Sequence, residues 1–200
     1  MDCKIIDYGT GNIQSVYNAL KYLGHTVSKT NDPNEFKNCD CLIFPGQGAF
    51  GPAIKTCDEL NIIKPLTNYI KEKKPFIGIC LGFQLLFDES SESINDHGLG
   101  AFKGQFKQFD NTNLVVPHMG WNTIQCPTNH PVLSQFNNQY VYFVHSFYLP
   151  TTIEPHFCTT NYGQPFISAI ANNTQLATQF HPEKSGNVGL ELLDTFLKSL

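Results

Sequence analysis

The chain has 200 residues, 41% of them hydrophobic, and a formal net charge of −4, which suits a single domain over residues 1–200 with a substantial core. This charge favours neither a nucleic acid nor an anionic membrane surface as a partner. All 13 basic residues are lysines. Because arginine is the usual bidentate ligand for phosphate, we expect that no phosphorylated substrate is held mainly by this chain.

The elements predicted for the first half alternate between strands and helices. Short apolar runs predict strands, and apolar residues three and four apart predict helices. A tight turn at residues 8–11 precedes Asn12, which can cap the first helix. The predicted strands span residues 3–7, 25–29, 41–44 and 75–79, and the predicted helices span residues 13–23, 60–73 and 81–87. This alternation is typical of a mostly parallel sheet with helices on both faces.

The second half of the chain is rich in predicted strands. A polar loop is predicted first, at residues 90–97. Strands are then predicted at residues 102–109, 122–126, 140–149, 165–171 and 175–180, and a last helix at residues 186–200. The sequence therefore predicts an α/β fold: a single domain with a mostly parallel central sheet, helices on both faces and a β-rich antiparallel extension.

The seven cysteines lie at scattered spacings without a Cys-x-x-Cys pair. This arrangement is typical of reduced thiols in the cytoplasm rather than of a disulfide framework. The seven histidines show no paired spacing of the kind that metal ligands have, so we expect neither a metal nor another cofactor. No apolar run is long enough to cross a bilayer, and the N-terminus lacks the apolar core of a signal peptide. We therefore expect a cytoplasmic protein.

A Gly-x-Cys-x-Gly motif, Gly78 to Gly82, joins an apolar run to a predicted helix. The same strand–turn–helix pattern places the nucleophile of many hydrolases on a sharp turn, where only residues without a side chain fit at the flanks. Cys80 would stand at a helix N-terminus, where backbone N–H groups favour the thiolate. The alternative is a small buried apolar residue, which many cysteines are. We predict that Cys80 is a catalytic nucleophile.

A nucleophilic cysteine needs a base, and the base needs a group that orients it. His181 and Glu183 are two residues apart, so in an extended chain their side chains point to the same side. Pro182 biases His181 towards that extended geometry. Glu183 would then hold the imidazole while its other ring nitrogen faces Cys80. The sequence thus predicts a triad of Cys80, His181 and Glu183.

These motifs resemble the class I glutamine amidotransferase family. The likeness extends from residue 5 to the C-terminus, and its more specific segments are residues 7–12, 45–50, 117–122, 142–146 and 183–186. The last three read Pro-His-Met-Gly-Trp-Asn, Tyr-Phe-Val-His-Ser and Glu-Lys-Ser-Gly. These segments are similar to the branch of the family that serves the synthesis of imidazole glycerol phosphate and AICAR in histidine biosynthesis.

The resemblance implies a glutaminase reaction. Cys80 would attack the side-chain amide of glutamine, ammonia would leave, and water would hydrolyse the thioester. Both steps need an oxyanion hole. The resemblance assigns that hole to the backbone of Leu81 and of Gln47 with Gly48. It assigns the binding of glutamine to four further residues: Gly46, Gln84, Ser146 and Phe147.

The resemblance also implies a partner, a (β/α)₈ barrel cyclase subunit resembling HisF, which would receive the ammonia in a heterodimer. The expected contacts with it are Asn12, Trp121, Tyr142 and Lys184. Each has a simpler reading: Asn12 as a helix cap, Trp121 as a core residue and Lys184 as a solvated charge. Other functions left open are a related glutaminase that feeds another synthase, such as one that amidates a sugar for surface polysaccharide, and a stand-alone cysteine hydrolase.

Gln47 departs from the family pattern, which more often has valine at this position. An amide side chain beside the proposed oxyanion loop can hydrogen-bond that loop in one conformation. We therefore expect Gln47 to pin a resting state of the loop, from which the partner would release it. His118 and His145, by contrast, have no carboxylate at short spacing, so we expect structural roles for them.

Overall fold

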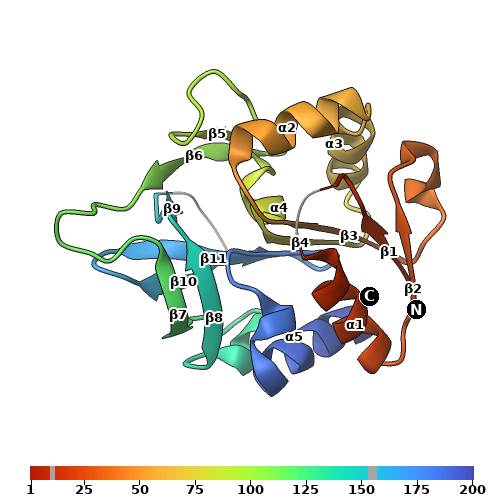
Figure 1. Ribbon diagram of the computed structural model, residues 1–200. Helices are drawn as coiled ribbons and strands as arrows, with labels where there is room; N and C mark the ends of the chain where they lie inside the picture. Colours follow the sequence, from red (N-terminus) through yellow and green to blue (C-terminus); the bar gives the residue numbers. More distant parts are fainter. Residues whose placement is uncertain (10–11, 153–156) are drawn as a thin grey trace.

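The computed structural model describes residues 1–9, 12–152 and 157–200. Within them, a ten-stranded mixed sheet forms the centre of the molecule, and a second sheet of two strands lies beside it (Figure 1). The tight turn predicted at residues 8–11 includes Thr10 and Gly11, which lie outside the described residues.

Five neighbouring strands of the large sheet run parallel, in the order β2–β1–β3–β4–β12. They are β2 (Thr26–Thr30), β1 (Asp2–Ile6), β3 (Cys41–Gly46), β4 (Phe76–Cys80) and β12 (Gln175–Thr178). The central strands β3 and β4 are buried along their whole length, as parallel strands covered on both faces are. These strands and the helices between them are called the parallel half below.

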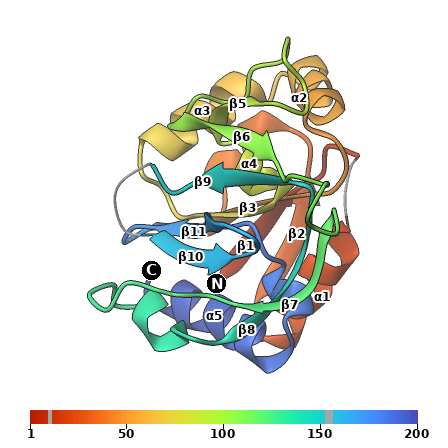
Figure 2. The same cartoon turned by 90° about the vertical axis from the view of Figure 1, so that its left-hand side faces the viewer.

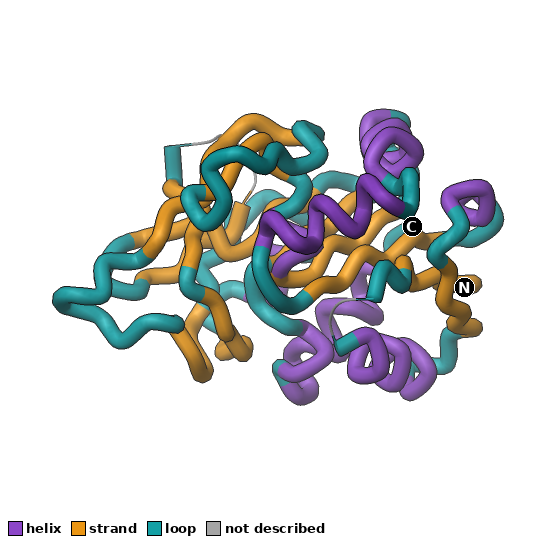
Figure 3. The backbone as a smooth tube through the Cα atoms, turned by 45° about the horizontal axis from the view of Figure 1, so that its top comes forward, coloured by secondary structure: helices purple, strands orange, loops and turns teal. Residues whose placement is uncertain are grey.

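Helices cover both faces of this half (Figures 1 and 3). One face packs against α1 (Ile13–Tyr22) and α5 (Gly186–Lys198) through an apolar core that includes Leu20 and Phe196. The other face packs against α2 (Phe50–Glu59), α3 (Ile63–Lys71) and the short α4 (Leu81–Gln84). The predicted arrangement of a mostly parallel sheet between helices is therefore confirmed.

The rest of the large sheet is mainly antiparallel and is called the β-rich half below. It continues from β12 in the order β11–β9–β6–β5, with β10 paired to β11. Its strands are β11 (Pro165–Ala171), β10 (Phe157–Asn161), β9 (Phe147–Pro150), β6 (Phe102–Gln108) and β5 (Phe87–Ser90). This half also includes an antiparallel ribbon of β7 (His118–Thr123) and β8 (Tyr140–His145), which packs against α5 (Figure 2).

Several elements differ from the sequence prediction. Helix α2 was not predicted, since its first turn contains Gly51 and Pro52, yet proline is tolerated there because the first N–H groups of a helix have no partner within it. The predicted strand at 140–149 is two strands, because the chain bends at Ser146 and passes from the ribbon into the large sheet. Strands β5 and β10 were not predicted, and β7 lies earlier than its prediction at 122–126.

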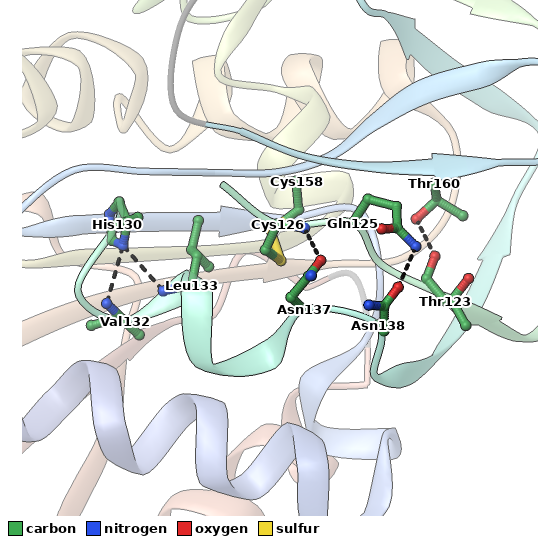
Figure 4. The surroundings of a disulfide bond; sticks show 10 residues. All are labelled: Thr123, Gln125, Cys126, His130, Val132, Leu133, Asn137, Asn138, Cys158 and Thr160. Atoms are coloured by element: carbon green, nitrogen blue, oxygen red, sulfur yellow. Dashed lines mark hydrogen bonds between the residues drawn. A yellow bond between two sulfur atoms is a disulfide. The ribbon is translucent and has the colours of Figure 1, made fainter. Parts of the chain in front are cut away.

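A disulfide bond joins Cys126 to Cys158 beside the ribbon (Figure 4). The expectation that all seven cysteines are reduced thiols is therefore wrong for this pair. The two residues meet because Gln125 and Thr159 exchange backbone hydrogen bonds of 2.7 and 2.8 Å, which aligns their neighbours across the strands. Their separation of 32 residues in sequence gives no local pattern that would reveal the pairing.

Three 3₁₀ turns complete the fold: η1 (Pro33–Lys37), η2 (Leu133–Phe136) and η3 (Pro182–Lys184). The last of these lies between β12 and α5. It contains Glu183, and His181 directly precedes it. In the described ranges, no helix is both long and apolar enough to cross a membrane.

Candidate active site

Cys80 stands on a strained turn between β4 and α4. Its φ angle of 53° and ψ angle of −105° lie outside the regions that residues with a side chain normally adopt. At the flank, a Cβ on Gly82 would overlap the carbonyl oxygen of Phe44 on the neighbouring strand. Only glycine allows this close approach of strand and helix. The predicted geometry of the cysteine turn is confirmed.

The loop expected to form the oxyanion hole lies beside this turn because β3 and β4 are parallel and in register. Gly46, the last residue of β3, is the partner of Cys80 in the ladder. The next residues, Gln47 and Gly48, therefore leave the sheet beside Cys80. Gly48 has a φ angle of +106°, a conformation that favours glycine. The N–H of Phe50, which begins α2 directly after this loop, donates to a carboxylate oxygen of Glu92 at 3.0 Å.

His181 and Glu183 form a buried hydrogen-bonded pair. Nδ1 of His181 lies 2.8 Å from Oε1 of Glu183, and the two side chains are 2% and 1% exposed. Burial by itself lowers the pKa of His181. The charge of Cys80 and the hydrogen bonds to Cys80 and Glu183 outweigh it and raise the pKa to about 10. The imidazole therefore holds a proton at neutral pH when Cys80 is a thiolate, with Nε2 left for the sulfur.

Three hydrogen bonds fix His181 to the ribbon. Its N–H donates to the carbonyl oxygen of Tyr142 at 2.9 Å. The hydroxyl of Ser185 donates to the carbonyl oxygen of His181 at 2.6 Å and accepts from the N–H of Tyr142 at 2.9 Å. The predicted base is thus held by β8, whereas the predicted nucleophile is held by β4.

These elements enclose a cavity of about 450 Å³. Ten of the residues singled out from the sequence line it: Gln47, Gly48, Cys80, Leu81, Gln84, Tyr142, Ser146, Phe147, His181 and Lys184. Asn12, Gly46 and Glu183 line a much smaller space on the other side of His181. Trp121 lines neither; it is 55% exposed on β7, with its ring 6.1 Å from that of Tyr142. The simpler reading of Trp121 as a core residue is therefore wrong.

Four further residues line the cavity but were not assigned to the site from the sequence: Glu92, Pro117, Val144 and His145. Glu92 lies in a polar segment without a recognisable pattern, and only the packing of that segment against α2 brings its carboxylate to the cavity. Pro117, Val144 and His145 lie in segments that carried the family resemblance, which was the available signal. Their positions depend on the pairing of β7 with β8.

His145, which lines the cavity, forms a buried pair with His118 behind it. Nδ1 of His118 lies 3.0 Å from Nε2 of His145, and Nδ1 of His145 lies 2.8 Å from the carbonyl oxygen of Phe147. Since a carbonyl only accepts, His145 donates from Nδ1 and accepts at Nε2, so His118 donates from Nδ1. Burial lowers the pKa of His118 to about 4 and that of His145 to about 3, so both rings are neutral. The expected structural role fits this arrangement.

The family model described as "Glutamine amidotransferase class-I" matches residues 4–200. The chain belongs to the class I glutamine amidotransferase family.

Relatives of this amidotransferase have a consistent name. The imidazole glycerol phosphate synthase subunit HisH of Methanosarcina barkeri is 40% identical, and the match covers 96% of each chain. Imidazole glycerol phosphate synthase hisHF of Arabidopsis thaliana, a chloroplastic protein, is 44% identical over 96% of this chain. The chain spans only a third (33%) of that relative's own length.

A solved structure of a glutamine amidotransferase shares the fold of this one. The two superpose with a TM-score of 0.75 at 17% identity, and the match covers 98% of this chain and 97% of the other. At this identity the likeness concerns the fold alone. Among the described residues of this amidotransferase, no group of three or more histidine, cysteine or acidic side chains is placed to hold a metal ion.

Proposed function

We propose that the chain, acting as one domain over residues 1–200, is the glutaminase subunit of an imidazole glycerol phosphate synthase. It would hydrolyse glutamine through Cys80, His181 and Glu183 and pass ammonia to a HisF-like (β/α)₈ barrel cyclase. The observation that carries this proposal is the buried His181–Glu183 pair beside a cysteine on a strained turn, with His181 and the cysteine lining the same cavity.

The reaction begins with the thiolate of Cys80, paired with a protonated His181. The sulfur attacks the side-chain carbonyl carbon of glutamine, and the C–N bond breaks as His181 gives its proton to the departing nitrogen. Neutral His181 then takes a proton from water, which attacks the thioester. The C–S bond breaks, and glutamate and the thiolate are released. Glu183, bonded to Nδ1, keeps Nε2 directed at the reacting atoms.

Both tetrahedral intermediates carry negative charge on oxygen, so N–H groups are needed beside Cys80. The N–H of Leu81 follows the nucleophile directly at the start of α4. The second donor is assigned to the loop of Gln47 and Gly48, which the register of Gly46 with Cys80 places beside the turn. The hydrogen bond from Phe50 to Glu92 anchors the far end of this loop.

The amino acid end of glutamine would meet the polar wall of the cavity. Glu92 contributes a carboxylate there, which suits the α-ammonium group of the substrate. Gln84, on α4, adds a neutral amide. Ser146 and Phe147, at the bend between β8 and β9, offer backbone groups, and the loop after Gly46 closes the site.

The proposed partner would cover the mouth of the cavity on the ribbon side. Met119 and Trp121 alternate along β7 and are 63% and 55% exposed, and Tyr140 on β8 is 60% exposed. Tyr142 and Lys184 connect this surface to the cavity, and Asn12 lies behind His181. Two relatives support the assignment. One is named a synthase subunit, and the other, the hisHF protein of Arabidopsis, extends well beyond the third of its length that this chain matches, which leaves room for a second unit. The absence of arginine agrees with a phosphorylated acceptor held by the partner.

We infer a cytoplasmic location for the protein. Five of its cysteines are free thiols, which suits a reducing compartment. The Cys126–Cys158 bond is compatible with that compartment because its sulfurs are shielded: Cys158 is fully buried and Cys126 is 8% exposed.

The test of this function is Cys80→Ala in complex with a HisF-like barrel. Glutamine-dependent synthesis of imidazole glycerol phosphate should be lost, because no other nucleophile stands on the turn. Synthesis from added ammonium salt should persist at the wild-type rate, because the barrel's chemistry is separate. Cys57→Ala, a free buried cysteine of α2, is the matched control and should retain both activities. Glutamine-dependent activity in the Cys80 variant would contradict the proposal.

The partner surface has its own test. Trp121→Ala should weaken binding to the barrel at least about tenfold, as truncation of a central aromatic contact does. Tyr22→Ala, an 80% exposed aromatic at the C-terminal end of α1, is the matched control and should leave binding unchanged. Titration of each variant with the barrel by calorimetry measures both. Equal affinity of the two variants for the barrel would mean that the barrel does not bind at the Trp121 surface.

A further inference from the structure

Gln179 is fully buried next to the nucleophile, and the reaction steps above give it no task. It follows β12, and its N–H continues the sheet by donating to the carbonyl oxygen of Ser168 at 2.8 Å. Its side-chain nitrogen lies 3.7 Å from the sulfur of Cys80. Its side-chain oxygen accepts from the amide nitrogen of Gln84 at 3.0 Å. One amide therefore contacts both the nucleophile and a residue of the glutamine cavity.

The sulfur determines which way these two amides point. A thiolate attracts N–H groups and repels a carbonyl oxygen, so Gln179 turns its nitrogen to Cys80 and its oxygen away. That oxygen can only accept, so Gln84 must turn its own nitrogen towards it. The carbonyl oxygen of Gln84 is then left for a ligand of the cavity, as an acceptor. The negative charge on the sulfur thus sets the orientation of the Gln84 amide at the cavity.

We propose that Gln179 is a positioning residue for this glutaminase: its N–H stabilises the Cys80 thiolate, and its carbonyl fixes the amide of Gln84 in the orientation that accepts a donor group of glutamine. This inference rests on the proposed function. It adds an N–H donor at the sulfur, beside His181; the carbonyl oxygen of Val144, 4.0 Å away, can instead only accept from the protonated thiol.

A comparison between Gln179 and a second buried glutamine, at the start of β12, separates positioning from simple burial. Gln175 is also buried, at 7% exposure, and its amide nitrogen donates to the carbonyl oxygen of Ile70 at 2.7 Å. It makes the same kind of bond at the other end of the strand and contacts no residue of the active site cavity. Loss of either amide should cost stability, but only the loss of Gln179 should change the chemistry of Cys80.

The first test measures Cys80 without substrate or partner. The rate of Cys80 alkylation by iodoacetamide is followed against pH, with the modified peptide identified by mass spectrometry. In Gln179→Leu, which keeps the volume but removes the donor, the alkylation profile should move to higher pH, and alkylation at pH 7 should slow at least about tenfold, the usual effect of a hydrogen bond to a charged group. In Gln175→Leu the profile should match that of the wild type.

A second variant separates the two tasks of Gln179. Gln179→Glu keeps an oxygen for Gln84 but presents no N–H to the sulfur. Its alkylation profile should move at least as far as that of Gln179→Leu. In steady-state glutaminase assays, however, the KM for glutamine should rise several-fold only in Gln179→Leu, while kcat falls in both. Thermal unfolding of all three variants shows which of them fold.

The outcomes are distinguishable. An unchanged alkylation profile in a folded Gln179→Leu or Gln179→Glu would overturn the inference while leaving the glutaminase proposal intact. Equal shifts in the Gln179 and Gln175 variants would also overturn it, because both would then act through general destabilisation. A wild-type Cys80 that is no more reactive at pH 7 than the free thiol of Cys39 would instead contradict the proposed function itself.

Discussion

The two halves of the molecule contribute different parts of the site. The parallel half supplies the proposed nucleophile: Cys80 ends a strand that is buried along its whole length, and the turn after it is fixed by close packing. The β-rich half supplies the wall that meets the substrate and, through Tyr142, the surface to which His181 is bonded. The proposed reaction would take place where the two halves meet. A substitution at the cysteine turn of the parallel half should therefore alter the reactivity of Cys80. A substitution in the β-rich half should alter the binding of substrate or the position of His181.

The largest effects are expected at the proposed base and its orienting group, which both lie in the connection from β12 to α5. His181→Asn should lower kcat for glutamine hydrolysis by roughly 10²–10⁴, because both acylation and deacylation need proton transfer. Glu183→Gln should cost less, roughly 10–10², since it changes only the tautomer and the angle of the ring. Steady-state assays measure both, with Glu191→Gln on the exposed side of α5 as a control that should remain within about twofold. A harsher effect of Glu183→Gln would reverse the two roles.

The β-rich half should respond to acid through its buried histidines. The folded state lowers the pKa of His118 to about 4 and that of His145 to about 3, from an ordinary value of 6.5, because burial opposes charge. The unfolded chain therefore binds protons first as pH falls. The contribution of these two histidines to the free energy of unfolding is therefore fully present above pH 6.5. Between pH 6.5 and about pH 4 it should fall by about 1.4 kcal/mol per pH unit for each histidine.

Urea unfolding between pH 7 and pH 4.5 measures this loss. The double variant His118→Gln/His145→Gln should show a shallower dependence on pH, even if it is less stable at pH 7. His97→Gln, an exposed histidine, is the control and should keep the wild-type slope. An unchanged slope in the double variant would mean that the pair does not account for acid sensitivity.

The disulfide distinguishes the halves in a different way, because it anchors the ribbon segment only within the β-rich half. Closing a loop of 32 residues restricts the unfolded chain, which corresponds to about 3–4 kcal/mol. Cys126→Ser should therefore lower the melting temperature by about 10 °C. Dithiothreitol under conditions that reduce buried disulfides should do the same to the wild type, and should not affect the variant. Identical melting curves for wild type and variant would show that the two thiols are not bonded in solution.

The smallest effect is expected at Gln47. The sequence predicts that its amide pins the loop of residues 47 and 48, but in the described part of the chain no residue makes a hydrogen bond with this side chain. The pin is therefore not present in this conformation. Gln47→Val should change the glutaminase rate by no more than about twofold, with or without the barrel, because valine keeps the backbone N–H and loses no hydrogen bond of the side chain. A large change in the rate that is seen only without the barrel would support the original prediction that Gln47 holds the loop in a resting state.

Sequence reasoning succeeded where a property is local. The cysteine turn follows from the glycines at positions 78 and 82, and the His181–Glu183 bond follows from a two-residue spacing. It failed where the property depends on partners distant in sequence. Glu92 reaches the cavity only through packing against α2, and the Cys126–Cys158 bond depends on the pairing of Gln125 with Thr159. The β-rich half contains most of these distant contacts, so its strand boundaries were also the least predictable.

One measurement addresses the nucleophile itself. The enzyme is mixed with glutamine, with the barrel present, and quenched in acid during turnover, and its peptides are analysed by mass spectrometry. The expected result is a glutamyl adduct on the peptide that contains Cys80, and hydroxylamine should remove it, as it cleaves a thioester. The adduct should be absent from Cys80→Ala. In His181→Asn it should accumulate if hydrolysis slows more than acylation. Full turnover with no adduct in either enzyme, or an adduct on another residue, would contradict a thioester at Cys80.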